Sequence, residues 1–447
     1  MTEVKKYPEE PLKTWNKAKE LRLKYFTSYA KAHETGGLRF CGSAGSLNSI
    51  QQAFGRDVFI LGSEPYSAHA AFFSDFARKC QEACESRGIA HDLCGYMKNY
   101  WGGILINQFI LPTHEIVPWP KADVMWTQHI CCTHAKWYQY AGELEGGVPE
   151  FGIDFNCRIG HTMTDRDIDY VLEQVLEGIE WVEKVTGRKF DDELFIEASL
   201  NELAANSAWG QAYEYNQNIP APIDEKSLYS FFPFNILCPQ WAETSALFRE
   251  LRDELKDRVD RGIAAVGNER FRILTDGPPQ WAMLQVYRYM EKVYGAVTLG
   301  STYTAYWGTG WDVAEDGSLI AAKIPTREEF AQLNREARLR KYIAWKLSKQ
   351  EAYSVTFTGC HPRKSALMLK IMELWKLDGA IIHLNRGCEG SAMGVLENRL
   401  DIIKAGYPVL TYEGNMGDVR DFDYAGTIRK IENFFENLGL EKLIKGG

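Results

Sequence analysis

The cysteines are the residues of this sequence whose chemistry is easiest to infer from their positions. Cys94 opens a predicted helix (LCGYMKNYWG). Cys131 and Cys132 stand where a predicted strand (DVMWTQHI) ends, and Cys388 follows another predicted strand (DGAIIHL). In open α/β sheets, sites form at the carboxyl ends of strands, where loops from separate segments converge. Helix N-termini there favour thiolates. Three such cysteines would suit an iron–sulfur cluster with one iron open to substrate or water.

The remaining cysteines have a plainer interpretation, and any ten cysteines offer some such triple. Cys80 and Cys84, four residues apart on a predicted helix, are interpreted as buried thiols, because unpaired Cys behaves as a small hydrophobe. The same interpretation is given to Cys41, Cys157 and Cys238. Cys360, in TGCHPRK, is a rival ligand at a similar strand-to-helix junction.

Familiar loops for other chemistries are missing from the sequence. It has no Gly-x-x-x-x-Gly-Lys-Ser/Thr and no Gly-x-Gly-x-x-Gly after a strand, which disfavours ATP or dinucleotide binding by such a loop. Neither His-Glu-x-x-His nor Cys-x-x-Cys occurs. Gly-x-Ser-x-Gly is also absent, so a hydrolase nucleophile elbow is unsupported.

Composition and charge narrow the function classes further. With 45% hydrophobic and 25% charged residues the 447-residue chain has the composition of a globular protein. Its net charge of −9, without a basic block, argues against nucleic-acid binding. No apolar run approaches the ~18 residues that span a bilayer. The N-terminal residues lack the apolar stretch of a secretory signal, so the expected location is cytoplasmic, where thiols stay reduced.

Hydrophobic periodicity predicts two α/β segments around a helical one. A helix is expected over 12–34, as an arm outside the first lobe. The first segment is expected to hold strands at 57–61, 123–130 and 151–155 and a helix at 66–87. The second is expected to hold strands at 271–274, 295–299, 378–384 and 407–411 and helices at 282–294, 326–349, 389–404 and 427–438.

This pattern predicts two Rossmann- or flavodoxin-like parallel-sheet lobes with helical additions. The expected division is an N-terminal helical arm (1–37), a first α/β lobe (38–163), a helical region (164–270) and a second α/β lobe (271–447). The carboxyl ends of the strands in both lobes are then the places where the cysteines could meet.

The motifs around these cysteines resemble a known family. LCGYMKNYWGG, ADVMWTQHICCTHAKWY and the stretch from DGAIIHLNRGCEGSAMG to the last helix are similar to the D-component superfamily of 2-hydroxyacyl-CoA dehydratases. Within it, the chain most resembles the larger cluster-carrying (B-type) subunit of ATP-dependent class I benzoyl-CoA reductases. The resemblance covers nearly the whole chain and includes the order of the motifs and their spacing to the C-terminus.

The resemblance implies a [4Fe-4S] cluster between two lobes, held by one cysteine from each of three segments. These map to Cys94, Cys131 and Cys388, with Cys132 as the alternative to Cys131. It also implies a smaller homologous cluster-carrying subunit, ATP-binding activator-type subunits, a ferredoxin upstream and an aryl-CoA substrate. Neither nucleic acid nor a membrane is an expected partner.

One departure from the family pattern bears on the reaction. Dehydratases of the family commonly carry acidic residues before an Ala-x-Gly of the first lobe, whereas Leu47–Gly55 has none. The resemblance therefore implies ATP-driven, low-potential electron transfer that reduces the ring of an aryl-CoA thioester. The segments Tyr96–Trp101 and Trp137–Tyr140 could wall a ring pocket, or could be ordinary packing. No proton donor is identified. His129, His134, His383 and Glu389 lie near the ligands in sequence, where most polar residues serve hydrogen bonding.

Three alternatives stay open. The first is a subunit of an (R)-2-hydroxyacyl-CoA dehydratase, in which the electron is returned and ATP is needed only to start the reaction. The second is the double-cubane reductase branch, which should supply more cysteines around one site, for example Cys360 and Cys132. The third is a non-catalytic scaffold or CoA-binding subunit without a cluster, in which the three cysteines are ordinary buried thiols.

Overall fold

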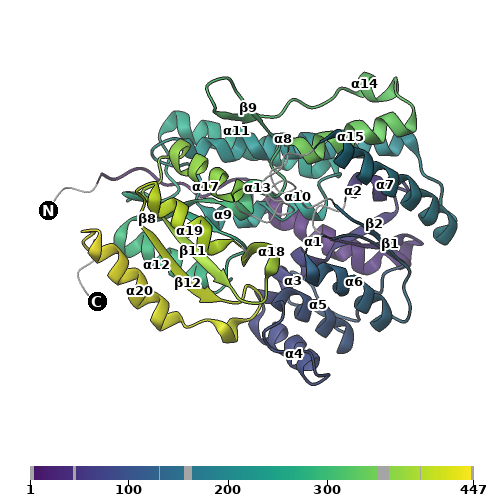
Figure 1. Ribbon diagram of the computed structural model, residues 1–447, viewed down its shortest axis with the longest axis horizontal. Helices are drawn as coiled ribbons and strands as arrows, with labels where there is room; N and C mark the ends of the chain where they lie inside the picture. Colours follow the sequence, from purple (N-terminus) through teal and green to yellow (C-terminus); the bar gives the residue numbers. More distant parts are fainter. Residues whose placement is uncertain are drawn as a thin grey trace.

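Two four-stranded parallel sheets organise the molecule (Figure 1), in a computed structural model that describes residues 5–43, 47–129, 131–155, 164–349, 362–392 and 394–443. The first sheet has the order β2-β1-β5-β6 and the second the order β12-β11-β7-β8, with every neighbouring pair parallel. The first contains β1 (Leu38–Gly42), β2 (Val58–Gly62), β5 (Val124–Gln128) and β6 (Glu150–Ile153). The second contains β7 (Phe271–Asp276), β8 (Ala296–Ser301), β11 (Gly379–Asn385) and β12 (Val409–Gly414). The predicted α/β class with two parallel-sheet lobes is confirmed.

Helices cover the first sheet, and its strands are accordingly buried along most of their length. They are α2 (Asn48–Gln52), α3 (Ser63–Ala71), α4 (Ser74–Glu85), α5 (Gly95–Leu105) and α6 (Cys132–Leu144). A small hairpin, β3 (Phe109–Ile110) and β4 (Ile116–Val117), follows α5. The prediction of one helix over 66–87 was wrong, because the chain breaks at Phe72 and Phe73 into α3 and α4.

The N-terminal helix α1 (Trp15–Lys31), followed by the short helix η1 (Ala32–Thr35), was predicted correctly as an element but not in its place. It packs directly on the first lobe instead of lying outside it. The Tyr25 hydroxyl donates to the Ile60 carbonyl (2.5 Å) and accepts from the Gly62 amide (2.9 Å), so α1 is bonded to the carboxyl end of β2. Tyr25, Phe26 and Tyr29 are almost completely buried, which gives α1 a continuous apolar face.

The region between the lobes is helical, as expected. It contains α7 (Asp165–Thr186), α8 (Asp192–Glu214), η2 (Tyr215–Gln217), α9 (Glu225–Phe231), α10 (Phe234–Leu237) and α11 (Ala242–Arg261). Helices α8 and α11 lie side by side across the back of both lobes (Figure 1). Trp209 and Tyr213 on α8 are fully buried, and Tyr213 reaches the second sheet by accepting from the Ser301 amide (2.7 Å).

The second lobe completes the fold and sends one excursion back to the first. Its elements are α12 (Met283–Tyr294), α13 (Thr302–Tyr306), β9 (Trp311–Val313), β10 (Leu319–Ala321), α14 (Arg327–Ala331), α15 (Arg335–Lys349), α17 (Arg363–Leu374), α18 (Glu389–Ala392), α19 (Val395–Lys404), η3 (Val419–Asp421) and α20 (Tyr424–Asn437). The Thr326–Glu329 capping box begins α14, yet the predicted helix over 326–349 is two helices, of which α15 packs on α7. The predicted helix over 389–404 is likewise divided into α18 and α19.

In the parts of the chain that are described, no helix is both long enough and apolar enough to cross a membrane.

Candidate functional site

One cavity between the lobes brings together the three cysteines singled out from the sequence. It has a volume of about 90 Å³, and Cys94, Cys131 and Cys388 all line it. Cys94 immediately precedes α5 and Cys131 immediately precedes α6, both on the first lobe. Cys388 follows β11 of the second lobe and immediately precedes α18. The sequence positions at strand ends and helix starts therefore translate into one shared space.

The surroundings of Cys94 decide the charge that its sulfur carries. Burial raises the pKa of the Cys94 thiol well above its ordinary value, and the nearby sulfurs of Cys388 and Cys131 raise it further. The backbone N–H groups of Met97 and Tyr96, at the start of α5, hydrogen-bond to this sulfur and act in the opposite direction. A bound metal cation would reverse the balance, because it stabilises the thiolate directly.

Cys388 is held by a buried polar network on the second lobe. The Ser391 hydroxyl donates to the Cys388 sulfur (2.9 Å). The Ser391 carbonyl in turn accepts from the ammonium of Lys364 (3.3 Å), which forms a fully buried ion pair with Asp276 (2.8 Å). The turn that carries Cys388 is thus fixed to the carboxyl end of β7.

The start of α18 also approaches the start of α6. A Cβ atom added to Gly390 would lie 3.6 Å from the Cβ of Cys131, an ordinary van der Waals distance. The segments that carry Cys131 and Cys388 are therefore direct neighbours, although they belong to different lobes.

The other cysteines separate clearly from this group. Cys132 is exposed as the first residue of α6 and does not line the cavity, so its position favours Cys131 of the adjacent pair. Four cysteines are buried away from the cavity, as interpreted from the sequence: Cys41, Cys80, Cys84 and Cys238. Cys157 and Cys360 lie outside the described residues.

The cavity walls are mostly apolar and aromatic. The wall residues with large side chains are Tyr96, Trp137, Ile236, Tyr303, Trp307 and Met416. Of the two aromatic segments considered from the sequence, Tyr96 and Trp137 face this space. Trp101 instead packs behind the wall and donates to the Trp137 carbonyl (2.9 Å). Such a wall excludes water, which strengthens every electrostatic interaction inside.

An acid–base pair at the cavity was missed by the sequence analysis. Glu64 and His134 both line the cavity, and the His134 Nε2 lies 2.6 Å from the Glu64 Oε1. Tyr138 donates to the same carboxylate oxygen (3.1 Å), and Ser63 donates to the other (3.0 Å). A signal for Glu64 was available, since it stands two residues after β2 at the carboxyl edge of the first sheet.

The remaining polar candidates lie elsewhere. His129 is exposed and paired with Asp154 (3.0 Å). His383 is buried, its Nδ1 is 2.8 Å from the Pro278 carbonyl, and its ring stacks on Tyr412. Burial lowers the pKa of His383 to about 4, so it is neutral at physiological pH. Nothing is described of the Glu389 side chain.

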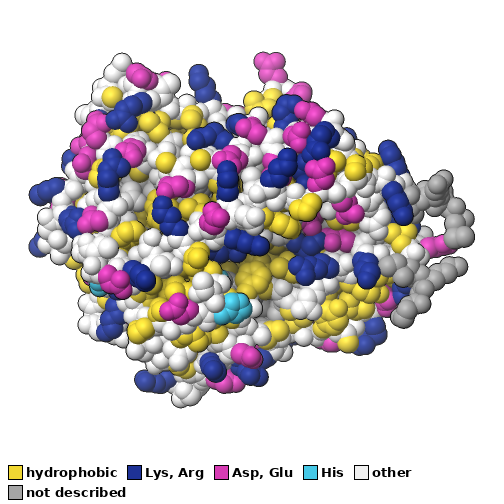
Figure 2. Space-filling model, turned by 180° about the vertical axis from the view of Figure 1, so that it is seen from behind, with side chains coloured by type: hydrophobic (Ala, Val, Ile, Leu, Met, Phe, Trp, Pro, Cys, Tyr) yellow, Lys and Arg dark blue, Asp and Glu magenta, His cyan; other side chains and the backbone are white. Residues whose placement is uncertain are grey.

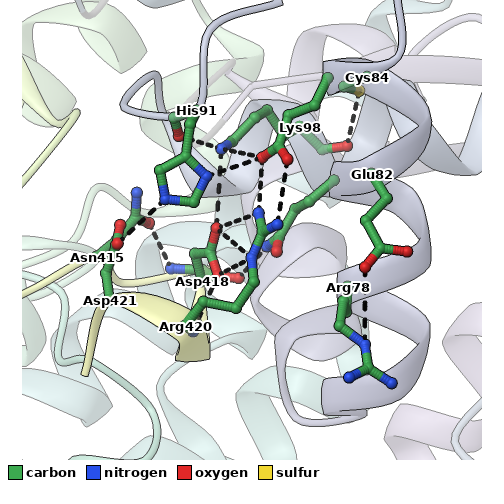
Figure 3. Close-up of polar contacts among 12 residues, drawn as sticks. Arg78, Glu82, Cys84, His91, Lys98, Asn415, Asp418, Arg420 and Asp421 are labelled. Atoms are coloured by element: carbon green, nitrogen blue, oxygen red, sulfur yellow. Dashed lines mark hydrogen bonds and ion pairs between the residues drawn. The ribbon is translucent and has the colours of Figure 1, made fainter. Parts of the chain in front are cut away.

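An ion-pair network joins the two lobes next to Cys94 (Figure 3). Lys98, one turn into α5, is completely buried and lies 3.3 Å from Glu85 and 3.8 Å from Asp418. Arg420 of the second lobe binds both carboxylates (2.6 Å to Glu85, 2.7 Å to Asp418). Glu85, His91 and Asp418 are close enough together to hold a metal ion. The two cations already present neutralise these carboxylates, so the cluster serves as a link between lobes.

Backbone packing reinforces that link. A side chain at Gly95 would meet Asn415 at 2.3 Å and the Gly417 backbone at 3.0 Å. The Gly417 carbonyl also accepts from Gln81 (2.6 Å). The start of α5, and with it Cys94, is thereby fixed against the loop that follows β12 of the second lobe.

Comparisons with known proteins agree with this architecture. Residues 66–438 match the family described as 2-hydroxyglutaryl-CoA dehydratase, D-component. The chain is 25% identical to the alpha subunit of (R)-2-hydroxyisocaproyl-CoA dehydratase of Clostridioides difficile, over 96% of this chain and 97% of that protein. It is 27% identical to the alpha subunit of lactoyl-CoA dehydratase of Anaerotignum propionicum (79% and 80%). It is 24% identical to the B-type subunit of benzoyl-CoA reductase of Thauera aromatica (79% and 78%). The chain belongs to this D-component family.

Proposed function

We propose that this D-component protein is the cluster-holding subunit of an (R)-2-hydroxyacyl-CoA dehydratase. Cys94, Cys131 and Cys388 would hold a [4Fe-4S] cluster in the cavity between the lobes. The observation that carries the proposal is the meeting of these three cysteines with the Glu64–His134 pair at one apolar-walled cavity. The names of four of the matched relatives, which are dehydratase alpha subunits, support the reaction.

The residues at the cavity fit such a cluster. Thiolates are the protein ligands of iron–sulfur clusters, and three of them leave one iron without a protein sulfur. The apolar walls and the helix N-termini behind Cys94 and Cys131 suit a buried anionic group. When bound, the cluster would supply electrons at low potential and a Lewis-acidic iron for the departing hydroxyl group.

The chain's own residues would supply proton transfer and positioning. Dehydration removes a hydroxyl group from C2 of the acyl chain and a proton from C3, so a base must stand at the cavity. The Glu64 carboxylate is suited to accept that proton, while His134, Tyr138 and Ser63 hold its two oxygens in place. The aromatic walls would keep water from the reacting thioester.

The expectation of ring reduction rested on a missing carboxylate, and the structure weakens that argument. Leu47–Gly55 indeed lacks acidic residues, but Glu64 places a carboxylate at the cavity from the next helix. Reduction of an aryl-CoA ring, with ATP consumed at every turnover, is therefore the second candidate. The aromatic walls favour it, because Tyr96, Trp137 and Tyr303 could pack around a planar ring. Comparing 2-hydroxyacyl-CoA and benzoyl-CoA substrates separates the two reactions.

We further propose partners from the same relationship. Two of the matched relatives' names designate alpha subunits of (R)-2-hydroxyacyl-CoA dehydratases, and another designates the B-type subunit of a reductase. A smaller homologous subunit, an ATP-binding activator and an upstream ferredoxin would complete the system. Co-purification with the product of a neighbouring reading frame is the direct check.

Iron and acid-labile sulfide, measured after strictly anaerobic purification with the co-expressed partner, test the cluster. We expect about four of each to be assigned to this chain, in accordance with one [4Fe-4S] cluster. Cys388→Ser should lose them, whereas Cys132→Ser, a change at the exposed neighbour of Cys131, should keep them. Full iron content in Cys388→Ser would refute the ligand assignment and leave the scaffold alternative in place.

A further inference from the structure

The cysteine cavity is too small for the whole of a CoA thioester. Its volume is about 90 Å³, whereas sites that enclose a ligand of ordinary size measure roughly 300–1,000 Å³. Under the proposed function the reacting thioester lies in this cavity. The pantetheine arm and the nucleotide of CoA must then occupy space that adjoins it.

A second cavity, of about 340 Å³, adjoins the first. The two share Ile236 and Tyr303 as lining residues. Large apolar side chains form most of its wall, among them Phe26, Phe72, Phe232, Trp281 and Leu284. The Phe72 ring lies 4.8 Å from that of Trp281, which gives the wall a flat aromatic surface. Apolar walls with a few polar groups suit a slender arm with isolated amides.

A third cavity, of about 720 Å³, continues from the second through Lys226, Ser230 and Arg288, which line both. Lys226 is engaged by Asp224 (2.5 Å) and by Glu291. Arg288 and Lys292 also line the third cavity, and in the described part of the chain neither forms an ion pair. Both are exposed, so positive charge is available at this end of the path.

An aromatic side chain stands at the same end. Trp15, at the start of α1, lines the third cavity and is 37% exposed, which leaves part of its ring open to a ligand. On the face that Figure 2 shows, an apolar hollow is bordered by Lys and Arg side chains, the same combination that the second and third cavities offer.

We propose that the three cavities form one binding path for CoA, an inference that rests on the proposed function. The thioester lies at the cysteines and the pantetheine arm passes between Tyr303 and Trp281. The phosphates lie against Arg288 and Lys292, since cationic side chains are the usual phosphate partners. The adenine packs on Trp15, because every base offers a flat face to an aromatic ring.

Calorimetric titration of the anaerobically purified subunit complex with CoA and with pantetheine tests the path without any turnover. For the double variant Arg288→Glu, Lys292→Glu we expect CoA to bind at least tenfold more weakly and pantetheine to bind unchanged. Trp15→Ala should weaken CoA binding by a few-fold and leave pantetheine binding intact. Lys79→Glu, the same charge reversal on the exposed face of α4, is the matched control and should behave as wild type.

The outcomes separate this inference from the proposed function. If wild type binds CoA and the double variant binds it equally well, the path is wrong and the dehydratase proposal stands. If pantetheine binding falls as much as CoA binding, the two cations do not contact the phosphates and the assignment is again refuted. If folded wild type binds neither CoA nor an acyl-CoA, the proposed function fails and the path fails with it.

Discussion

Glu64 is the residue whose chemistry the proposed reaction uses most directly. Changing it to Gln keeps the size and the hydrogen bonds from Tyr138 and Ser63 but removes the ability to accept a proton. We expect turnover to fall by about 10²–10⁴-fold, the usual contribution of a general base, with iron content unchanged. Steady-state dehydration assays and iron analysis on the same samples measure both. Glu143→Gln, on the exposed side of α6, should keep full activity, and an equally active Glu64→Gln would remove this residue from the mechanism.

Ser391 offers a second test at the scale of one hydroxyl group. Its hydrogen bond to the Cys388 sulfur stabilises negative charge there, and hydrogen bonds to ligand sulfurs raise the reduction potential of iron–sulfur clusters. Ser391→Ala should therefore lower the potential, by about 59 mV if the ratio of reduced to oxidised cluster changes tenfold. Ser391→Thr keeps the hydroxyl and should restore the wild-type value. A potentiometric titration followed by electron paramagnetic resonance measures the shift, and an unchanged potential in the Ala variant would disprove the effect.

At the scale of elements, the contact between α4, α5 and η3 holds the two lobes at a fixed distance. Hydrogen bonding to Arg420, followed by that to His91, lowers the pKa of Glu85 to about 2 from its ordinary 4.5. A carboxyl whose pKa is lower in the folded state stabilises the fold above its unfolded pKa, and that stability is lost as the pH falls through the folded pKa. The stabilising effect of Glu85 should thus be complete at pH 7 and disappear between about pH 4.5 and pH 2.

Glu85→Gln tests that statement. At pH 7 we expect the variant to lose about 1.5–3 kcal/mol of unfolding free energy, the range for hydrogen bonds to charged groups. The difference from wild type should shrink in urea unfolding experiments repeated at pH 4 and pH 3. Glu82→Gln, on the exposed side of the same helix, is the control. A difference that stays constant with pH would mean that Glu85 acts by packing and not by charge.

How far the sequence could predict these elements depended on how locally they are determined. The strands β5 and β11 and the helix starts at Gly95 and Thr326 were predictable, because apolar runs and capping residues are local signals. The central strand β1 was missed, since its five residues LRFCG carry an Arg and end on a Gly. That Arg39 is buried because its guanidinium donates to the Tyr29 and Ala30 carbonyls, which sequence periodicity does not reveal.

At the scale of the whole molecule, the site could be predicted only in part. The three cysteines were recognisable from their positions at strand ends and helix starts, but their distances from one another depend on how the lobes dock. Glu64 was missed because its role follows from contact with His134, 70 positions away in the sequence. The packing of α1 on the first lobe was missed for the same reason. Long-range contacts, unlike periodicity, leave no trace in a single sequence.

The division of the cavity between the lobes has a consequence for the birth of the protein. Two of its cysteines leave the ribosome early, whereas Cys388 emerges only when most of the chain has been synthesised. Until then the thiols of Cys94 and Cys131 have no third partner, although the first lobe has its own sheet and core on which to fold. Loading of the site is therefore a post-translational event. A cell must keep these thiols reduced throughout that interval.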